Sequence, residues 1–440
     1  MGTPTPRLAF ALVAMEGPDQ YSQAGGLGVR VAQLSRALVA GGHPTSLYFV
    51  GDPALPESQL WDGVQLRRIG QEIAREFPGG VYQGEQLKVS YLAAHFPQRL
   101  VADWVEPTLA QGLRPVLLFE EWQTASWALG AFELLQESGH ADRCLLLWNA
   151  NNQFGFEGID WVGLERAAGI TTISRHMRLL VAGFGVDPIV IPNGVPEEYL
   201  SPVDPEAVRV LREAAAPREI LLKVGRFHRD KRWVQAVRAL GELRRAKVAL
   251  RLLVRGSTEH HRLEVMDAAR EAGLSVSQWD QRVEGIADLA EALRATPEVD
   301  VLELTQFLPE RLLPPLYAAA LAVLANSGFE PFGLVGLEAM AAGGVAVVGA
   351  TGEDYARHLH NSLVIETDSP SELAQAIHRV AGNAELAAEI RQAARAMSAT
   401  YSWPLVVQGD LLPRLALLAE RQGVVWPGEK GSDQLEERGR

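Results

Sequence analysis

The sequence contains very little cysteine and no long apolar run. Cys144 is the only cysteine among 440 residues, which excludes an internal disulfide framework and is typical of a reducing compartment, so we expect a cytoplasmic protein. The apolar run at 8–15, LAFALVAM, is far shorter than the ~20 residues of a membrane-spanning helix. It ends in acidic and turn-forming residues, which predicts a first β-strand rather than a leader peptide.

Metal-ligand patterns and excess positive charge are also missing. There is no Asp-x-Asp pair and no His/Cys group at ligand spacing, which predicts no metal site. The 41 Lys and Arg residues are outnumbered by 54 Asp and Glu residues, giving a net charge of −13. This charge disfavours nucleic acid or an anionic membrane as the main partner. The sequence carries no signal for a particular oligomeric state.

Apolar, strand-like runs alternate with helix-like segments along the whole chain. The runs stand at 8–15, 45–50, 115–122, 144–150, 219–225, 248–256, 321–327 and 345–350. This alternation predicts an α/β protein with parallel sheets covered on both faces. The proline-rich stretch at 189–207 separates two Rossmann-like halves, each with room for a ligand at the carboxyl ends of its strands.

A glycine-rich turn, QAGGLG at 23–28, follows the first predicted strand. Gly25 and Gly26 lack a Cβ atom, so their backbone can approach a ligand closely, and the start of the next helix can receive a phosphate. The alternative interpretation is an ordinary strand-to-helix turn without a ligand.

Two cations follow a strand in the segment KVGRFHRDKRW at 223–233. Arg226 offers a planar fork and Lys231 a mobile point charge, so together they can clamp a diphosphate. The alternative is a pair of ordinary solvated charges.

The segment FEPFGLVGLE at 329–338 joins a predicted strand to a predicted helix. We expect Pro331 near the first helical position, with the N–H groups of 332–334 facing an anion above the sheet. Glu338 is the only charged residue between Glu330 and Glu353. A carboxylate among such neighbours requires hydrogen-bond donors, and sugar hydroxyls are suitable ones.

Taken together, these segments resemble the retaining GT-B glycosyltransferases, the group 1 superfamily that includes glycogen synthases and sucrose-phosphate synthases. The resemblance covers nearly the whole chain, and its most specific part is 308–344. Its other parts are AGGLG at 24–28, EEWQTA at 120–125, AAGITTISRHMRLL at 167–180, IVIPNGV at 189–195 and YSWPLVV at 401–407.

The resemblance implies a GT-B fold, in which two Rossmann-like domains face each other across a cleft. We expect an N-terminal, acceptor-side domain at 1–195 and a nucleotide-sugar-binding domain at 196–400. A terminal helix at 401–422 would cross back to the first domain, and a tail at 423–440 is expected to be disordered.

The resemblance also implies a role for each matching residue. Arg226 and Lys231 would bind the donor diphosphate, Glu330 the donor sugar and Glu338 the ribose hydroxyls. Arg226, Lys231 and Glu330 are thus the expected catalytic residues. The remaining donor contacts would be the backbone of Phe332, Gly333 and Leu334, the segment 306–308 with Phe307 along the base, and Gly25, Gly26 and Asn193 from the other domain.

Two departures from the family pattern concern the donor sugar. The lysine that often precedes the first glycine pair is replaced by Gln23 or Ala24, and the expected histidine by Trp148, followed by Asn149. Either Asn149 takes over the contact to the donor sugar, or Trp148 is a core residue and the asparagines form a turn. The region 257–303 is also longer than the usual connection.

The activity that the resemblance implies is transfer of a hexose from a nucleoside-diphosphate sugar to an acceptor hydroxyl, with retention at the anomeric carbon. The acceptor would be a small molecule or a saccharide, and no metal or cofactor beyond the donor is expected. Two other interpretations stay open: another GT-B enzyme, such as a nucleotide-sugar epimerase or an inverting transferase, and a catalytically silent nucleotide-sugar sensor or partner subunit.

Overall fold

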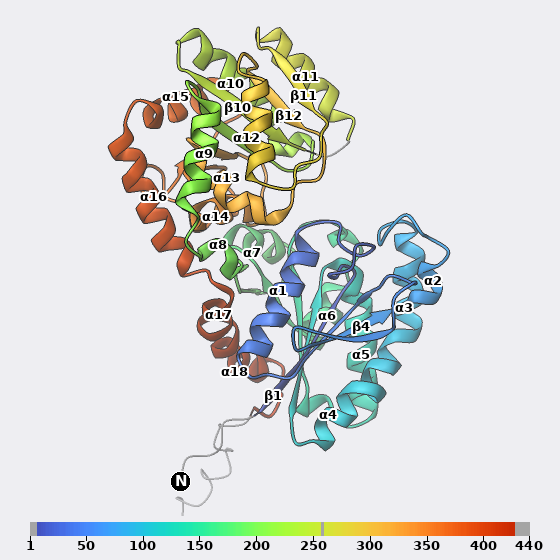
Figure 1. Ribbon diagram of the computed structural model, residues 1–440. Helices are drawn as coiled ribbons and strands as arrows, with labels where there is room; N and C mark the ends of the chain where they lie inside the picture. Colours follow the sequence, from blue (N-terminus) through green and yellow to red (C-terminus); the bar gives the residue numbers. More distant parts are fainter. Residues whose placement is uncertain (1–6, 257–258, 427–440) are drawn as a thin grey trace, which may run out of the picture. The chain divides into compact units, whose positions relative to one another are not determined.

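The computed structural model describes residues 7–256 and 259–426, which form two compact units (Figure 1). The N-terminal unit runs to Gly194 and resumes at Trp403, and the C-terminal unit spans Val195–Ser402. These divisions lie one and two residues from the boundaries expected at 195 and 400. Most of the expected disordered tail, 427–440, lies outside the described residues.

The N-terminal unit is built on an eight-stranded sheet in the order β3-β4-β2-β1-β5-β6-β7-β8. All its neighbours are parallel except β3 and β4. The strands are β1 (Leu8–Ala14), β2 (Thr45–Val50), β3 (Ser58–Trp61), β4 (Val64–Ile69), β5 (Arg114–Glu120), β6 (Leu145–Ala150), β7 (Gly169–Thr172) and β8 (Ile189–Val190).

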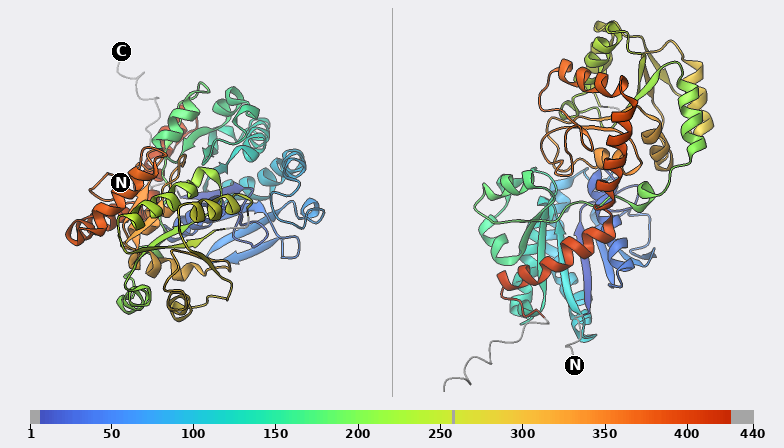
Figure 2. Two further views of the ribbon diagram at one scale, coloured as in Figure 1. Left: turned by 90° about the horizontal axis from the view of Figure 1, so that it is seen from above. Right: turned by 90° about the vertical axis from the view of Figure 1, so that its left-hand side faces the viewer.

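Helices cover both faces of this sheet because its strands are apolar on both sides. Side chains of α1 and of the terminal helices pack with alternate residues of β1 on one face, and Figure 2 shows these terminal helices, in red, lying across the sheet. On the other face Phe96 of α3 contacts Tyr48 and Trp127. The helical segments are α1 (Gly26–Ala40), α2 (Gln71–Ala74), α3 (Glu85–Leu100), η1 (Val101–Val105), α4 (Glu106–Ala110), η2 (Trp122–Thr124), α5 (Ala125–Glu137), η3 (Ala141–Arg143), η4 (Phe156–Gly158), α6 (Trp161–Ala167), α7 (Arg175–Ala182), α17 (Trp403–Leu405), η7 (Val406–Leu411) and α18 (Leu412–Arg421).

The C-terminal unit contains a seven-stranded parallel sheet in the order β11-β12-β10-β9-β13-β14-β15. The strands are β9 (Glu219–Val224), β10 (Leu250–Arg255), β11 (Val276–Trp279), β12 (Val301–Leu304), β13 (Ala322–Ala325), β14 (Ala346–Val348) and β15 (Leu363–Val364). The helical segments are α8 (Glu197–Leu200), α9 (Pro205–Ala215), η5 (Arg229–Lys231), α10 (Trp233–Arg245), α11 (His261–Glu271), α12 (Ile286–Ala295), η6 (Glu310–Leu312), α13 (Leu313–Ala319), α14 (Leu334–Ala341), α15 (Pro370–Ala381) and α16 (Ala384–Ala399).

The long region at 257–303 contributes structure of its own to this unit. Its described part forms α11, β11 and α12, and β11 is an edge strand that pairs with β12. The proline-rich stretch at 189–207 is not wholly irregular, because it contains β8 and α8 and the start of α9. Pro205 stands at the first position of α9 behind the capping side chain of Asp204, an arrangement that favours helix initiation.

The prediction of an α/β protein with two sheets of mainly parallel strands is confirmed. The expected position of Pro331 is wrong, because α14 begins at Leu334 with Gly333 as its N-cap. Gly333 has a φ of 84°, a left-handed conformation that glycine adopts without strain. The turn after β13 is therefore longer than expected, and Pro331 belongs to it rather than to the helix.

Candidate functional site

Lys231 and Glu330 meet at the carboxyl ends of β9 and β13. Lys231 closes the short helix η5, and Glu330 lies in the turn between β13 and α14. The Lys231 Nζ donates to Glu330 Oε2 at 2.5 Å, and Ser327 Oγ donates to the same oxygen at 2.8 Å. An ammonium group has three N–H donors, so Lys231 can hold Glu330 and still donate to a phosphate oxygen. The structure thus brings together two of the three expected catalytic residues.

The turn that carries Glu330 leads directly into α14. A Cβ atom on Gly333 would lie 2.8 Å from both Glu353 Cγ and Tyr355 Oη, so this position has space for glycine alone. Among the described residues, no side chain caps the start of α14. The first N–H groups of the helix are therefore suited to an anion. The Phe332 side chain is buried against Tyr355, so this residue offers a ligand its backbone rather than its ring.

Arg226 and Phe307 are exposed side chains of the same unit. Arg226 follows β9, and among the described residues no ion pair involves it. Its backbone carbonyl accepts a bond from Trp233 Nε1 at 2.7 Å, which holds the loop while the side chain stays exposed. Phe307 is 71% exposed, so its ring is available for stacking. The roles expected for both residues stay predictions.

Glu338 is a half-buried carboxyl group on α14. Its one hydrogen bond among the described residues comes from the Tyr317 hydroxyl to Oε2 at a long 3.4 Å. Burial, with a smaller contribution from Glu310, raises the pKa of Glu338 to about 8. A carboxyl group this poorly supplied with donors fits the expectation that it accepts ligand hydroxyls.

Sequence reasoning missed a buried lysine beneath this site. Lys223 of β9 is 2% exposed, and its Nζ donates to Leu324 O at 3.0 Å and Asn326 Oδ1 at 2.7 Å. It also lies over the Trp233 ring, 4.9 Å from the centroid. Burial, with a smaller contribution from Lys231, lowers the pKa of Lys223 well below its usual value. The signal was present, since Lys223 is the single cation in the apolar run EILLKVG.

A second missed group, Glu353, supports the Glu330 turn from the loop after β14. Thr351 Oγ1 accepts the Glu330 N–H at 2.9 Å and is 3.1 Å from the Glu330 carbonyl oxygen, while Glu353 Oε2 accepts the Thr351 N–H at 3.0 Å. Burial and the charge of Glu330 raise the pKa of Glu353 to about 7. Glu353 was noticed only as the next charge along the chain, because its position in space depends on how the loop folds back.

In the N-terminal unit, the N–H groups of the glycine turn already have a partner. Glu16 Oε2, directly after β1, accepts the N–H groups of Ala24, Gly25 and Gly28 at 3.2, 2.9 and 3.0 Å. The start of α1 therefore binds an internal carboxylate where we expected room for a phosphate. The signal, a glutamate at the carboxyl end of the first strand, was read only as the end of an apolar run. The expected donor contacts of Gly25 and Gly26 stay predictions.

Asn149 is buried in β6 with its amide engaged. Its Nδ2 donates to Glu120 Oε2 at 2.9 Å, and its Oδ1 accepts from Thr171 Oγ1 at 2.9 Å. Trp148 is fully buried, as the core interpretation predicts, and its Nε1 donates to the Glu121 carbonyl at 3.0 Å. The Asn149 Nδ2 also donates to Asn151 Oδ1 at 3.1 Å, and the contact of Asn149 with a donor sugar stays a prediction.

Arg30 links Glu120 to Asn193, near the end of the first segment of the N-terminal unit. Its Nε lies 3.2 Å from both carboxylate oxygens of Glu120, and its Nη1 donates to Asn193 Oδ1. Its guanidinium also lies over the Trp403 ring, 5.8 Å from the centroid. The Asn193 amide is thus held from within the unit, and the donor contact expected of it stays a prediction.

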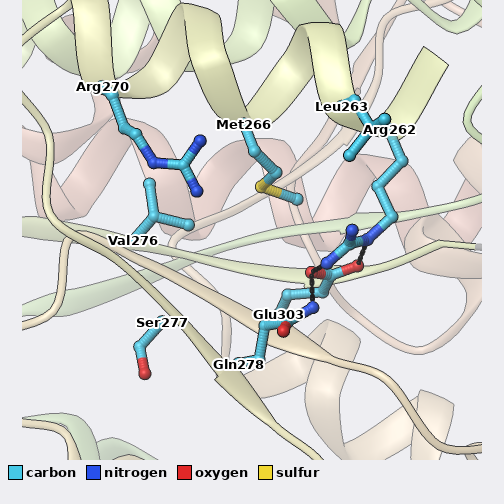
Figure 3. A pocket seen from close by; sticks show the side chains of 8 residues that line it. All are labelled: Arg262, Leu263, Met266, Arg270, Val276, Ser277, Gln278 and Glu303. Atoms are coloured by element: carbon cyan, nitrogen blue, oxygen red, sulfur yellow. Dashed lines mark hydrogen bonds and ion pairs between the residues drawn. The ribbon is translucent and has the colours of Figure 1, made fainter. Parts of the chain in front are cut away.

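A small pocket lies in the long 257–303 region, between α11, the edge strand β11 and its neighbour β12 (Figure 3). Its volume of about 280 Å³ is at the lower end for small-molecule sites. Arg262 pairs with Glu303 through two bonds of 2.5 Å, and Gln278 also donates to Glu303, at 2.9 Å. These side chains satisfy one another, and none of the residues expected to bind a ligand lines this pocket.

Two searches of the described residues gave negative results. No group of three or more His, Cys, Asp or Glu side chains in 7–256 and 259–426 is arranged to hold a metal ion. In the same ranges, no helix is long and apolar enough to cross a membrane.

Comparison with known proteins identifies the family of the C-terminal unit. Residues 209–397 match the family model "Glycosyl transferases group 1". A D-inositol 3-phosphate glycosyltransferase of Geodermatophilus obscurus is 31% identical over 258 residues, which cover 57% of this chain and 52% of that protein. The match thus spans about half the length of this curated relative.

Solved structures cover nearly the whole chain at lower identity. Sucrose-phosphate synthase from Thermosynechococcus elongatus superimposes with a TM-score of 0.66 at 20% identity, covering 94% of this chain and 100% of that chain. The catalytic domain of starch synthase IV from Arabidopsis thaliana, bound to ADP and acarbose, gives a TM-score of 0.66 at 18% identity, covering 94% of this chain and 99% of that chain. The chain therefore has the GT-B fold, and residues 209–397 of its C-terminal unit match the group 1 glycosyltransferase family model.

Proposed function

We propose that this protein is a retaining hexosyltransferase that uses a nucleoside-diphosphate sugar and needs no metal ion or other cofactor. The observation that carries the proposal is the Lys231–Glu330 pair beside the start of α14, which no side chain caps among the described residues. Together they offer a cation and free N–H groups for a diphosphate, and a carboxylate for the hydroxyls of the sugar.

The reaction breaks the bond between the anomeric carbon and the diphosphate oxygen, and forms a bond from the same carbon to the acceptor oxygen on the same face. The acceptor proton passes to the leaving diphosphate oxygen. Negative charge grows on the diphosphate during this step, and Lys231 and Arg226 stabilise that charge. Glu338 binds the ribose hydroxyls and Glu330 positions the sugar.

The named relatives support the class of reaction. The Geodermatophilus obscurus protein is named as a glycosyltransferase, and the starch synthase structure was solved with ADP and acarbose bound. Both names fit a chain that binds a nucleoside diphosphate and transfers a sugar. From the single cysteine, we also propose that the protein works in a cytoplasmic, reducing setting.

A panel of nucleoside-diphosphate sugars in a thermal-shift assay tests the proposal, because a ligand that binds the native state raises Tm by mass action. The best donor is then incubated with candidate acceptors, and the anomeric configuration of the product is read by NMR. We expect one donor to be consumed, slowly by hydrolysis when no acceptor is present, and with little change in excess EDTA. Activity that disappears in EDTA and returns with Mg²⁺ or Mn²⁺ would contradict the metal-free clamp.

A silent nucleotide-sugar sensor is the second candidate function. The observation that favours it is the engagement of the Asn149 amide by Glu120 and Thr171, next to Trp148, which stands where the resemblance expects a histidine. A protein that binds donor but neither transfers nor hydrolyses the sugar would establish this alternative.

A further inference from the structure

Hydrogen-bond acceptors gather at the carboxyl ends of β1 and β5 in the N-terminal unit. Glu16 follows β1, Glu120 ends β5, and Glu121 comes directly after it. Gln123 lies in the following helix η2, and its Nε2 donates to Oε1 of Glu85, at the start of α3, at 2.7 Å. Four carboxyl groups and one amide oxygen therefore approach one edge of this sheet.

Two of these acceptor atoms are buried without a hydrogen-bond partner among the described residues. Glu121 Oε2 is one, although Oε1 of the same carboxyl accepts the Asn151 N–H at 2.8 Å. Gln123 Oε1 is the other. Glu121 is 1% exposed and Gln123 4%, so water does not freely satisfy either atom. Leaving such atoms unpaired is costly, which indicates that a donor is missing from the site.

The cluster acts as one electrostatic unit. Burial, with smaller contributions from the charges of Glu120 and Glu16, raises the pKa of Glu121 to about 8. The Tyr82 hydroxyl donates to Glu16 Oε1 at 2.5 Å, and burial together with Glu16, Glu121 and Glu85 raises the pKa of Tyr82. Tyr82 is 40% exposed, so it is the member of the cluster nearest to solvent.

The nearby cations do not offset this negative charge at Glu121. Arg30 is directed to Glu120 and Asn193. Lys88 donates to Tyr21 Oη at 2.7 Å and to two backbone carbonyls of the loop at 80–81. The N–H groups at the start of α1, which would otherwise attract an anion, are occupied by Glu16. A phosphate entering here would meet the negative charge of the carboxylates of this cluster, which disfavours an anion.

We propose that this cluster binds a polyol that carries an ammonium group and no phosphate, as the acceptor of the transfer reaction. Its ammonium group donates to Glu121 Oε2 and its hydroxyls to Gln123 Oε1. The acceptor role rests on the function proposed above, whereas the preference for a cation rests on the cluster itself. In this respect the chain differs from the curated relative named for inositol 3-phosphate.

Calorimetry on the full-length protein with three probes of one ring size tests the proposal. The probes are inositol, its amine analogue inosamine, and inositol monophosphate. We expect inosamine to bind about tenfold or more tightly than inositol, the difference a charge-assisted bond makes, and the phosphate ester to bind weakest. The proposal is overturned if the phosphate ester binds tightest, if inosamine and inositol bind equally, or if inosamine does not bind.

A variant of Glu121 tests whether this residue causes the preference for the ammonium group. Glu121→Gln keeps the shape and removes the charge, so the ratio of inosamine to inositol affinity should fall towards one. Glu137→Gln, which neutralises an exposed carboxylate at the end of α5, should leave the ratio unchanged. An unchanged ratio in Glu121→Gln would refute the assignment. Nucleoside-diphosphate binding is measured on the same samples. If no nucleoside diphosphate binds, the proposed function fails, whereas the preference of the cluster for a cation is still decided by the three ring-matched probes.

Discussion

The two glycine-containing turns of this protein have the same plan and opposite electrostatics. Each follows a strand of a parallel sheet and leads into a helix, α1 in the N-terminal unit and α14 in the C-terminal unit. At α1 the helix start is bonded to the Glu16 carboxylate through three N–H groups. At α14 no described side chain caps the start, and the nearby Glu330 is bonded to Lys231 instead.

The difference shows that a glycine-containing turn before a helix does not by itself make an anion site. The N–H groups must also be free of an internal carboxylate. Helix N–H groups attract any carboxylate or phosphate within reach, so the site stays open only if no internal acid reaches it. Glu16 comes two residues after the end of β1, and its carboxylate bonds to the N–H groups at the start of α1. Glu330 precedes α14 but is directed to Lys231 and Ser327. The second turn can therefore receive a ligand phosphate, whereas the first is already satisfied.

The largest expected effect comes from removing the cation of the second turn. Lys231→Ala should lower turnover on the order of a hundredfold or more, because the lost charge stabilises the leaving diphosphate most in the transition state. Steady-state kinetics at saturating donor provide the measurement. Arg238→Ala, which removes an exposed cation on α10, serves as the control. Normal turnover of Lys231→Ala would remove Lys231 from the catalytic residues.

The next prediction removes the carboxylate from the first turn, so that its N–H groups become open to an anion as those at α14 are. Glu16→Ala leaves the N–H groups of Gly25 and Gly28 without their carboxylate, so we expect a loss of about 2–3 kcal/mol in the free energy of unfolding. Inorganic phosphate should then raise the Tm of the variant more than that of the wild type, because the variant offers the vacated N–H groups in addition to the open start of α14. The comparison fails if phosphate shifts both proteins equally.

A smaller effect concerns Glu338 and pH. Its pKa in the fold is raised from 4.5 to about 8, so the group becomes ionised only as pH rises through 8. Ribose hydroxyls donate best to the ionised form, so affinity for a nucleoside diphosphate should increase by up to about tenfold between about pH 6 and 9. Calorimetry across this range should give a flat profile for Glu338→Gln. A wild-type profile that is equally flat would exclude Glu338 as the ribose acceptor.

The same pKa shift predicts how the free energy of unfolding depends on pH. Since the folded state binds the Glu338 proton more tightly than the unfolded state, this group favours folding at low pH, and its contribution is lost as pH rises from about 4.5 to 8. Glu338→Gln should therefore weaken the decline in stability over that range, which chemical denaturation at several pH values can measure.

The smallest expected effect concerns the hydrogen bonds from Thr351 that hold the Glu330 backbone in the second turn. Thr351→Val removes the hydroxyl that bonds the Glu330 backbone, so we expect about 1 kcal/mol less stability and about fivefold slower turnover from a less ordered Glu330. Thr305→Val removes an exposed hydroxyl that bonds the Trp279 carbonyl in the same unit, and its turnover should be normal. Equal losses in the two variants would show that Thr351 has no special role in positioning Glu330.

The sequence by itself determined the fold class and the position of the second turn. Continuous apolar runs that alternate with helical segments can be buried only in parallel sheets covered on both faces, and β1, with every residue buried, shows this directly. The sequence also placed Lys231 and Glu330 after predicted strands, and the resemblance gave them their expected roles. The fold made β9 and β13 neighbours, which brings the two side chains together.

Only the tertiary structure decided which polar groups satisfy each other. Glu16 and Gly28 are twelve residues apart, Lys223 and Asn326 more than a hundred, and no local pattern reveals that they are bonded. Apolar periodicity specifies which residues are buried, since burial depends mainly on the residue and its neighbours along the chain. A hydrogen bond depends on the direction and reach of two particular side chains, which are set only when distant segments pack. For that reason the sequence predicted an open phosphate site at both turns, and the fold left one of them open.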